Sequence, residues 1–232
     1  MEGTVILLHG LGRTRRSMAY LDSQIQASGF DTRLLGYPSR RCTVREAAEH
    51  VSSELGDLQV EHPLIGLTHS MGGLVLRTLA SRFNWKGCVM LGPPNHASSM
   101  ARFVAATPPL RWLMGPACGE LVNEPLCPDP PRPCGIIVGT SGATLDNPPS
   151  WLGAMRGVFE HDEVHDGTVS LREAVHPAAT DLAMVHASHT RMMNHPETIS
   201  LVIRFLKTGG FGTAGMEPSL AEAAVATHAT SV

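Results

Sequence analysis

The stretch that decides the fold is Leu64-Ile65-Gly66-Leu67-Thr68-His69-Ser70-Met71-Gly72-Gly73-Leu74-Val75-Leu76, in which one serine separates two apolar runs. The first run is short and aliphatic, which predicts a buried strand, and the second opens a helix expected over Met71 to Arg82. Ser70 therefore stands at a tight turn between a strand and a helix. Such a turn projects its side chain, and the first amides of the helix point toward the same place.

Outward from this turn, short apolar runs bounded by Gly or Pro alternate with longer amphipathic stretches. This alternation is typical of βα units and a parallel sheet, and the runs lack the polar alternation of strands that face water. The sequence therefore predicts an α/β fold with a mostly parallel central sheet and helices on both faces. The expected strands are 5–8, 32–35, 64–67, 87–91, 135–138 and 181–185, and the other expected helices are 17–28, 43–56 and 196–207.

The chain has 232 residues, a size at which one domain can bury a single core. The formal charge is -3 and Lys and Arg are scattered, so nucleic acid is not an expected partner. No signal peptide is visible, and no apolar run approaches the roughly 20 residues of a membrane span. We therefore expect a soluble, cytoplasmic protein, and the sequence leaves its oligomeric state open.

Five cysteines form an odd set without close spacing, which indicates neither a disulfide framework nor a zinc site. Cys118, Cys127 and Cys134 fall in one Pro-rich stretch, so a bridge among them stays open for an oxidising compartment. Reduced thiols are the expectation for a cytoplasmic chain.

Ser70 has two interpretations at its turn. As a nucleophile it needs exposure to a base and backbone N–H groups close to the developing oxyanion, and small neighbours two places away allow the tight turn. Gly72 meets that requirement and Thr68 meets it partly. As a structural residue, Ser70 would only cap the helix, because Ser is a favoured N-cap residue.

The sequence resembles the α/β-hydrolase superfamily, and within it the bacterial lipases and carboxylesterases with little lid. Val5-Ile6-Leu7-Leu8-His9-Gly10-Leu11-Gly12 is similar to that family's strand with its His-Gly oxyanion loop. Ser70 resembles the serine of the family's G-x-S-x-G motif, with Thr68 in place of the first Gly. A second motif of the family, G-T-P-N/H-x-G-S/T, is similar to the segment Leu91-Gly92-Pro93-Pro94-Asn95-His96-Ala97-Ser98. The resemblance covers nearly everything from Thr4 to Lys207 and implies an α/β-hydrolase fold with a serine nucleophile.

The resemblance also implies an oxyanion hole made by the backbone N–H groups of Leu11 and Met71. The glycines after His9 let the chain turn sharply toward Ser70. We expect His9 to stabilise this turn and His69 to be packed or hydrogen-bonded, rather than either acting as the base. No cofactor and no metal are implied.

The order of catalytic residues in the family is Ser, then Asp or Glu, then His, so the base is expected after the last strand. His186, His189 and His195 lie there. His189 stands in the loop before a helix opened by Pro196, which matches the family's position. His186 ends the strand and His195 precedes Pro196, where surface or capping roles are expected. The sequence thus favours His189.

The acid is expected in the loop after the preceding strand. Asp146, Asp162 and Asp166 compete there, and Glu160 and Glu163 are weaker candidates. The segment that begins Asp166-Gly167-Thr168-Val169 is similar to the D-G-x-V segment of the family, so the resemblance selects Asp166.

Residues 95–134 are expected to form a cap or pocket-wall insert within a hydrolase domain that spans residues 1–207. The insert is rich in apolar side chains: Met100, Phe103, Val104, Leu110, Trp112, Leu113 and Met114. These side chains either pack in the core or line the pocket. If they line the pocket, they would favour a substrate with a non-polar acyl or alcohol group over one with a charged group. Prolines should stiffen this stretch, which predicts a rigid pocket without strong activation at a lipid interface. Residues 208–232 are expected to form a flexible tail.

The predicted function is hydrolysis of small-molecule carboxylic esters with short to medium acyl chains through an acyl-enzyme on Ser70. His189 would act as base and Asp166 would orient it. A true lipase, a thioesterase or an acyltransferase would use the same triad. A non-catalytic protein of this fold that binds a ligand in the pocket is the alternative from another class.

Overall fold

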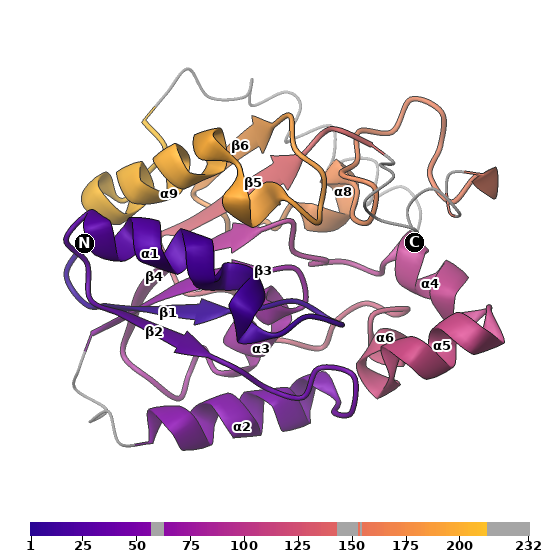
Figure 1. The fold of residues 1–232 in the computed structure, drawn as a ribbon, viewed down its shortest axis with the longest axis horizontal. Coiled ribbons are helices and arrows are strands. Elements are labelled where there is room, and N and C mark those ends of the chain that lie inside the picture. The colour runs from indigo at the N-terminus through magenta and orange to yellow at the C-terminus, as the bar shows by residue number, and fades with distance from the viewer. Residues whose placement is uncertain (57–62, 143–152, 154, 213–232) are drawn as a thin grey trace.

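The computed structural model describes residues 1–56, 63–142, 153 and 155–212 (Figure 1). Six strands form one parallel sheet in the order β2-β1-β3-β4-β5-β6. Their bounds are β1 Thr4–Leu8, β2 Thr32–Leu35, β3 Leu64–His69, β4 Trp85–Leu91, β5 Cys134–Gly139 and β6 Asp181–Val185. Each strand expected from the sequence overlaps one of these, so the predicted fold class is confirmed.

The helices connect the strands and cover the sheet. They are η1 Arg15–Met18, α1 Ala19–Ala27, α2 Val44–Leu55, α3 Gly72–Thr78, α4 Ser99–Ala105, α5 Pro108–Met114, α6 Pro116–Glu120, α8 Leu171–Ala174, η2 Met192–Asn194 and α9 Pro196–Thr208. The predicted start of α2 is observed as a reciprocal capping box, in which Glu46 N donates to Thr43 Oγ1 and Thr43 N donates to Glu46 Oε2.

Helix α3 ends earlier than the sequence predicted. The chain after Thr78 makes tight turns, because the amide of Arg82 donates to the carbonyl of Leu79 at 3.0 Å instead of to the carbonyl four residues back. The indole Nε1 of Trp85 donates to the same carbonyl at 3.0 Å. The last turn of the expected helix is therefore replaced by a turn that leads into β4.

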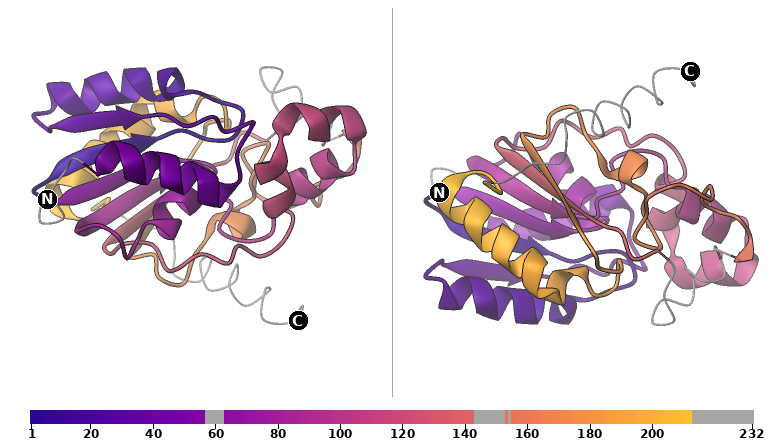
Figure 2. Two further views of the ribbon diagram at one scale, coloured as in Figure 1. Left: turned by 90° about the horizontal axis from the view of Figure 1, so that it is seen from below. Right: turned by 90° about the horizontal axis from the view of Figure 1, so that it is seen from above.

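Helices cover both faces of the sheet, because successive side chains of each strand point to opposite faces. Val5 and Leu7 of β1 face one core together with residues of α1 and α9. Ile6 and Leu8 face the other core, which holds residues of α2 and α3. Figure 2 shows α9 lying across the sheet in the view from above. The four inner strands β1, β3, β4 and β5 are thus covered on both faces, which explains why their buried residues do not alternate with polar ones.

Residues 95–134 contain α4, α5 and α6, which form a cluster beyond the carboxyl ends of the strands (Figures 1 and 2). The buried residues of α4 and α6 join the core that also holds residues of α2 and α3, whereas no residue of α5 is buried. Trp112 of α5 is 86% exposed. The insert is therefore partly core and partly surface.

The segment from residue 208 that the sequence analysis expected to be a flexible tail includes a residue that packs on the domain. Phe211 is only 1% exposed and packs on Phe205 of α9, with 5.2 Å between the ring centroids. Its amide donates to Asp181 Oδ2 at 2.6 Å. An aromatic side chain after the Gly209 cap thus extends the packed domain, and the rest of the predicted tail lies outside the described residues.

The five cysteines are free, including Cys118, Cys127 and Cys134. Across the described ranges, no helix is both long and apolar enough to cross a bilayer. Nor does this part of the chain contain a group of three or more His, Cys, Asp or Glu side chains that could hold a metal ion.

Candidate active site

Ser70 occupies a strained turn between β3 and α3. Its φ is 54°, and it is the one non-glycine residue with positive φ in the described ranges. For an L-residue this conformation costs about 1–2 kcal/mol, and such strain gathers at functional sites. Ser70 N donates to Leu91 O at 2.8 Å, which ties the turn to the end of β4. The N-cap of α3 is Met71 and no side chain caps this helix, so Ser70 is not an N-cap residue.

Small residues around Ser70 make the turn possible. A Cβ on Gly72 would lie 2.7 Å from the carbonyl oxygen of Leu8, and one on Gly10 would lie 2.9 Å from Ser70 Cβ. Thr68, where the resemblance expects glycine, is fully buried, and its hydroxyl faces Gly73 at 3.5 Å from the position of an added Cβ. Thr68 is thus accommodated at ordinary contact distance, and the close approach at Gly73 is to Met90, whose Cε would lie 2.5 Å from an added Cβ.

His189 and Asp166 form a hydrogen-bonded pair. His189 Nδ1 lies 2.6 Å from Asp166 Oδ2, and the amide of His189 donates to the carbonyl of Asp166 at 2.9 Å. The other carboxylate oxygen, Oδ1, accepts from the amides of Thr168 at 2.9 Å and Val169 at 2.8 Å. Asp166 has no exposed surface, so all its polar contacts are made inside the protein. This arrangement holds the imidazole in one orientation with Nε2 directed away from the carboxylate.

Gly92 makes space for this pair, a requirement that the sequence analysis missed. A Cβ at Gly92 would lie 2.9 Å from Asp166 Oδ2 and 3.1 Å from His189 Nδ1. Its φ of 50° also disfavours any residue with a side chain. The glycine at the end of β4 is thus needed both for the backbone turn and for the close approach of the His–Asp pair.

The loop after β1 packs against the nucleophile turn. Arg13 N donates to Gly10 O at 3.3 Å, which closes a turn around Leu11. Within the described ranges, the amides of Leu11 and Met71 donate no hydrogen bond to another residue. Leu11 and Ser70 line the same pocket. Two backbone donors without an internal acceptor therefore lie near the serine.

No protein-family model matches this sequence, and no curated protein matches it either. Solved structures do match its fold. A lipase from Bacillus licheniformis superposes with a TM-score of 0.68 at 16% identity, covering 89% of this chain and 91% of the lipase. The chain has the α/β-hydrolase fold.

Two further structures share this hydrolase fold. A methylesterase from Arabidopsis has a TM-score of 0.56 and 14% identity, with 89% of this chain and 99% of the methylesterase covered. A thermophilic esterase from Thermogutta terrifontis has a TM-score of 0.55 and 15% identity, with 92% of each chain covered. The hydrolase fold thus extends over almost the whole chain.

His69 and His9, the other histidines near the turn at Ser70, have structural contacts. His69 Nε2 donates to the carbonyl of His189 at 2.9 Å, and burial lowers the pKa of His69 well below its usual value. His9 Nδ1 donates to Gly10 O at 2.9 Å, and its ring stacks on Tyr37 with 4.3 Å between centroids. Burial also lowers the pKa of His9. Both rings are buried and hydrogen-bonded, as the sequence analysis expected.

The alternative bases and acids lie apart from the pair. His186 is exposed, and His195 is the N-cap residue of α9. Asp162 is exposed, and Glu163 lies 3.5 Å from Arg172 in an ion pair. Glu160 is exposed too, whereas Asp146 lies outside the described residues. Among the candidates that the structure describes, only Asp166 and His189 contact each other.

Ser70 and His189 line one pocket of about 210 Å³. Its apolar wall comes largely from the insert: Met100, Ala101, Val104, Met114 and Leu121. Part of the insert thus lines the pocket, as the sequence analysis allowed. Two charged side chains, Arg13 and Arg40, lie on the same pocket and were not singled out from the sequence.

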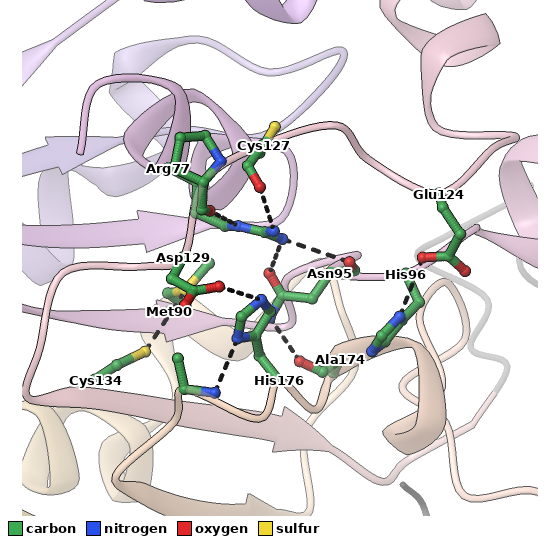
Figure 3. A network of polar contacts seen from close by, with 12 residues as sticks. Arg77, Met90, Asn95, His96, Glu124, Cys127, Asp129, Cys134, Ala174 and His176 are labelled. Carbon is green, nitrogen blue, oxygen red and sulfur yellow. Dashed lines mark hydrogen bonds and ion pairs between the residues drawn. The ribbon is translucent and has the colours of Figure 1, made fainter. Parts of the chain in front are cut away.

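A second polar cluster, centred on Arg77 of α3, lies outside the pocket (Figure 3). Arg77 is 4% exposed and donates to Pro128 O at 2.8 Å, to Cys127 O at 3.1 Å and to Asn95 Oδ1 at 3.0 Å. Asn95 Nδ2 donates to the carbonyl of Ala174 in α8 at 2.7 Å. These bonds join the helix that follows Ser70 to the segment that follows Asp166.

Proposed function

We propose that this protein is a serine hydrolase that cleaves carboxylic esters of short to medium acyl chain through an acyl-enzyme on Ser70. One observation carries the proposal: a serine in a strained strand-to-helix turn shares a pocket with a histidine that is hydrogen-bonded to a buried aspartate. Catalytic serines need such an activating base and a third group that orients the base.

In the proposed mechanism, Ser70 attacks the ester carbonyl while Nε2 of His189 takes its proton. Nδ1 of His189 is engaged by Asp166, so only Nε2 is available for this transfer. The amides of Leu11 and Met71 donate to the oxyanion. His189 then protonates the leaving alcohol, and water repeats the sequence to release the acid and regenerate Ser70. This mechanism needs no cofactor.

The size of the pocket supports the proposed acyl length. A volume of about 210 Å³ is below the roughly 300–1,000 Å³ that is usual for sites of drug-sized ligands. The apolar wall suits a short hydrocarbon chain. The named activities of the matching structures, a lipase and two esterases, agree with ester hydrolysis at this site.

Labelling with a fluorophosphonate probe tests the proposal. We expect stoichiometric labelling of the wild-type chain at the peptide that contains Ser70, and no labelling of Ser70→Ala. Absence of labelling in the folded wild-type chain would favour a non-catalytic ligand-binding protein instead. Labelling at a different serine would overturn the assignment of the nucleophile.

A panel of p-nitrophenyl acetate, butyrate, octanoate and palmitate tests the acyl length. We expect the highest kcat/KM for the acetate or butyrate ester, because the longer chains exceed the pocket. A preference for palmitate with a jump in rate above its emulsion threshold would indicate a true lipase. Turnover of acyl thioesters in preference to oxygen esters would indicate a thioesterase, and product formation that depends on an added alcohol would indicate an acyltransferase.

A further inference from the structure

The pocket that holds Ser70 has a positively charged edge. Arg13 and Arg40 line it, and none of its described lining residues is Asp or Glu. The carboxylate oxygens of Asp166 are hydrogen-bonded to His189 and to two backbone amides rather than to either arginine. A substrate in this pocket therefore meets two guanidinium groups.

Arg40 is held beside the oxyanion loop from two sides. Ser39 Oγ accepts from Gly12 N at 3.1 Å and donates to Arg13 O at 3.2 Å, which joins the segment before Arg40 to that loop. On the other side, a Cβ on Gly115 would lie 1.9 Å from the carbonyl oxygen of Arg40, so the insert packs directly on its backbone. The position of Arg40 is thus determined by both the loop and the insert.

The guanidinium group of Arg40 lies beside the loop that follows β1, and the same loop carries Arg13. Arg40 Nε and Nη2 lie 3.6 Å and 3.7 Å from the point that a Cβ on Gly12 would occupy. Arg13 is near enough to His69 that its charge adds to the lowering of the pKa of His69, after burial and His189. Positive charge is therefore concentrated at the loop after β1, where Met114 of the apolar wall also lies, 3.5 Å from the same point beside Gly12.

Arg40 is exposed and has no carboxylate partner in the part of the chain that the structure describes. A guanidinium at a pocket edge binds a carboxylate well, because its planar N–H groups can donate two parallel hydrogen bonds. We propose that the ester cleaved at Ser70 carries a second, free carboxylate, which Arg13 and Arg40 bind while the apolar wall contacts the carbon chain. This inference rests on the proposed function. It differs from the expectation drawn from the sequence, which was that the pocket favours a substrate with a non-polar group over one with a charged group.

The test compares esters that differ only in the charge of this second group. One pair is monomethyl glutarate and its terminal amide, in which the charge lies on the acyl side. The other is O-butyryl glycolate and the matching glycolamide ester, in which it lies on the alcohol side. We expect kcat/KM for the carboxylate to exceed that for the amide about 10-fold in at least one pair, mainly through KM. The preference should shrink as salt is raised, because salt screens exposed charges.

Arg13→Gln and Arg40→Gln should each reduce this ratio of carboxylate to amide turnover. Arg41→Gln is the matched control, because Arg41 is exposed, adjacent in sequence and not part of the pocket lining. The inference is overturned if the wild-type chain hydrolyses both amides as fast as the carboxylates, or if Arg41→Gln lowers the ratio as much as Arg40→Gln. If the chain hydrolyses only the esters whose second group is an amide, the proposed function still stands. No turnover of any ester together with no labelling of Ser70 would reject both the proposed function and this inference.

Discussion

The Nδ1 atom of His189 lies 2.6 Å from Oδ2 of Asp166, although the two residues are 23 positions apart in sequence. The amide of His189 also donates to the carbonyl of Asp166, so backbone and side chain hold the two loops together. A histidine constrained in this way has one free ring nitrogen, Nε2, and a fixed direction in which to accept a proton.

Asp166→Asn should lower kcat by about 10³-fold or more, because the amide cannot hold the imidazole in its working tautomer. Asp162→Asn is the control, since this exposed aspartate lies in the same region of the chain, and it should keep most of the activity. Steady-state kinetics with p-nitrophenyl butyrate measures both variants. A greater loss in Asp162→Asn would reassign the acid.

Ser70→Ala should lower kcat by about 10⁴-fold or more if the serine is the nucleophile. Its stability should change by no more than about 1 kcal/mol, because alanine meets the same backbone strain at this turn as serine does. Kinetics together with thermal unfolding separates the two effects. Esterase activity retained by the folded variant would exclude Ser70 as the nucleophile.

A chain that ends at Gly209 should melt at a lower temperature than a chain that ends at Gly212. The shorter chain loses Phe211, which is 1% exposed. Removing a buried aromatic side chain costs about 3–5 kcal/mol, which corresponds to a decrease in Tm of roughly 5 °C or more at this chain length. Calorimetry of the two chains makes the comparison, and equal Tm values would show that packing of Phe211 adds no stability.

His176 should make the folded state less stable in acid. Burial, and then the charge of Arg77, lower its pKa from 6.5 to about 4, so the unfolded chain binds a proton first as the pH falls. The stability that it contributes is therefore complete above about pH 6.5 and is lost progressively toward pH 4.

His176→Asn keeps an acceptor for the amide of Ala178, which donates to His176 Nδ1 at 3.1 Å. The variant should reduce the slope of unfolding free energy against pH by up to about 1.4 kcal/mol per pH unit between roughly pH 6 and pH 4. Urea titrations across this range measure the slope. The control is His186→Asn, because His186 is exposed in the folded chain. Identical slopes for wild type and His176→Asn would contradict the prediction.

The sequence by itself determined the sheet and the turn at Ser70. β1 is buried on both faces, so its run from Val5 to Leu8 is apolar without alternation, and that requirement is visible in a short local window. The turn is equally local, because a serine between an aliphatic strand and a glycine-rich helix start needs no distant residue to define it. The sequence favoured His189 over its neighbours only through the order of catalytic residues in the family that it resembles.

Only the tertiary structure decided which distant side chains meet. Asp166 could be separated from Asp162 by resemblance, but its full burial and its bond to His189 depend on how two loops pack over Gly92. Phe211 follows a glycine cluster that looks like the start of a tail, yet it fills a gap beside Phe205.

The charged edge of the pocket also depends on tertiary structure. Arg13 and Arg40 are 27 positions apart, among many scattered arginines, and no local pattern distinguishes them. The hydrogen bonds of Ser39 to the loop after β1 bring them to one pocket. Contacts between segments far apart in the chain depend on the packing of the whole fold. The burial of a strand and the geometry of a turn, in contrast, can be predicted from consecutive residues.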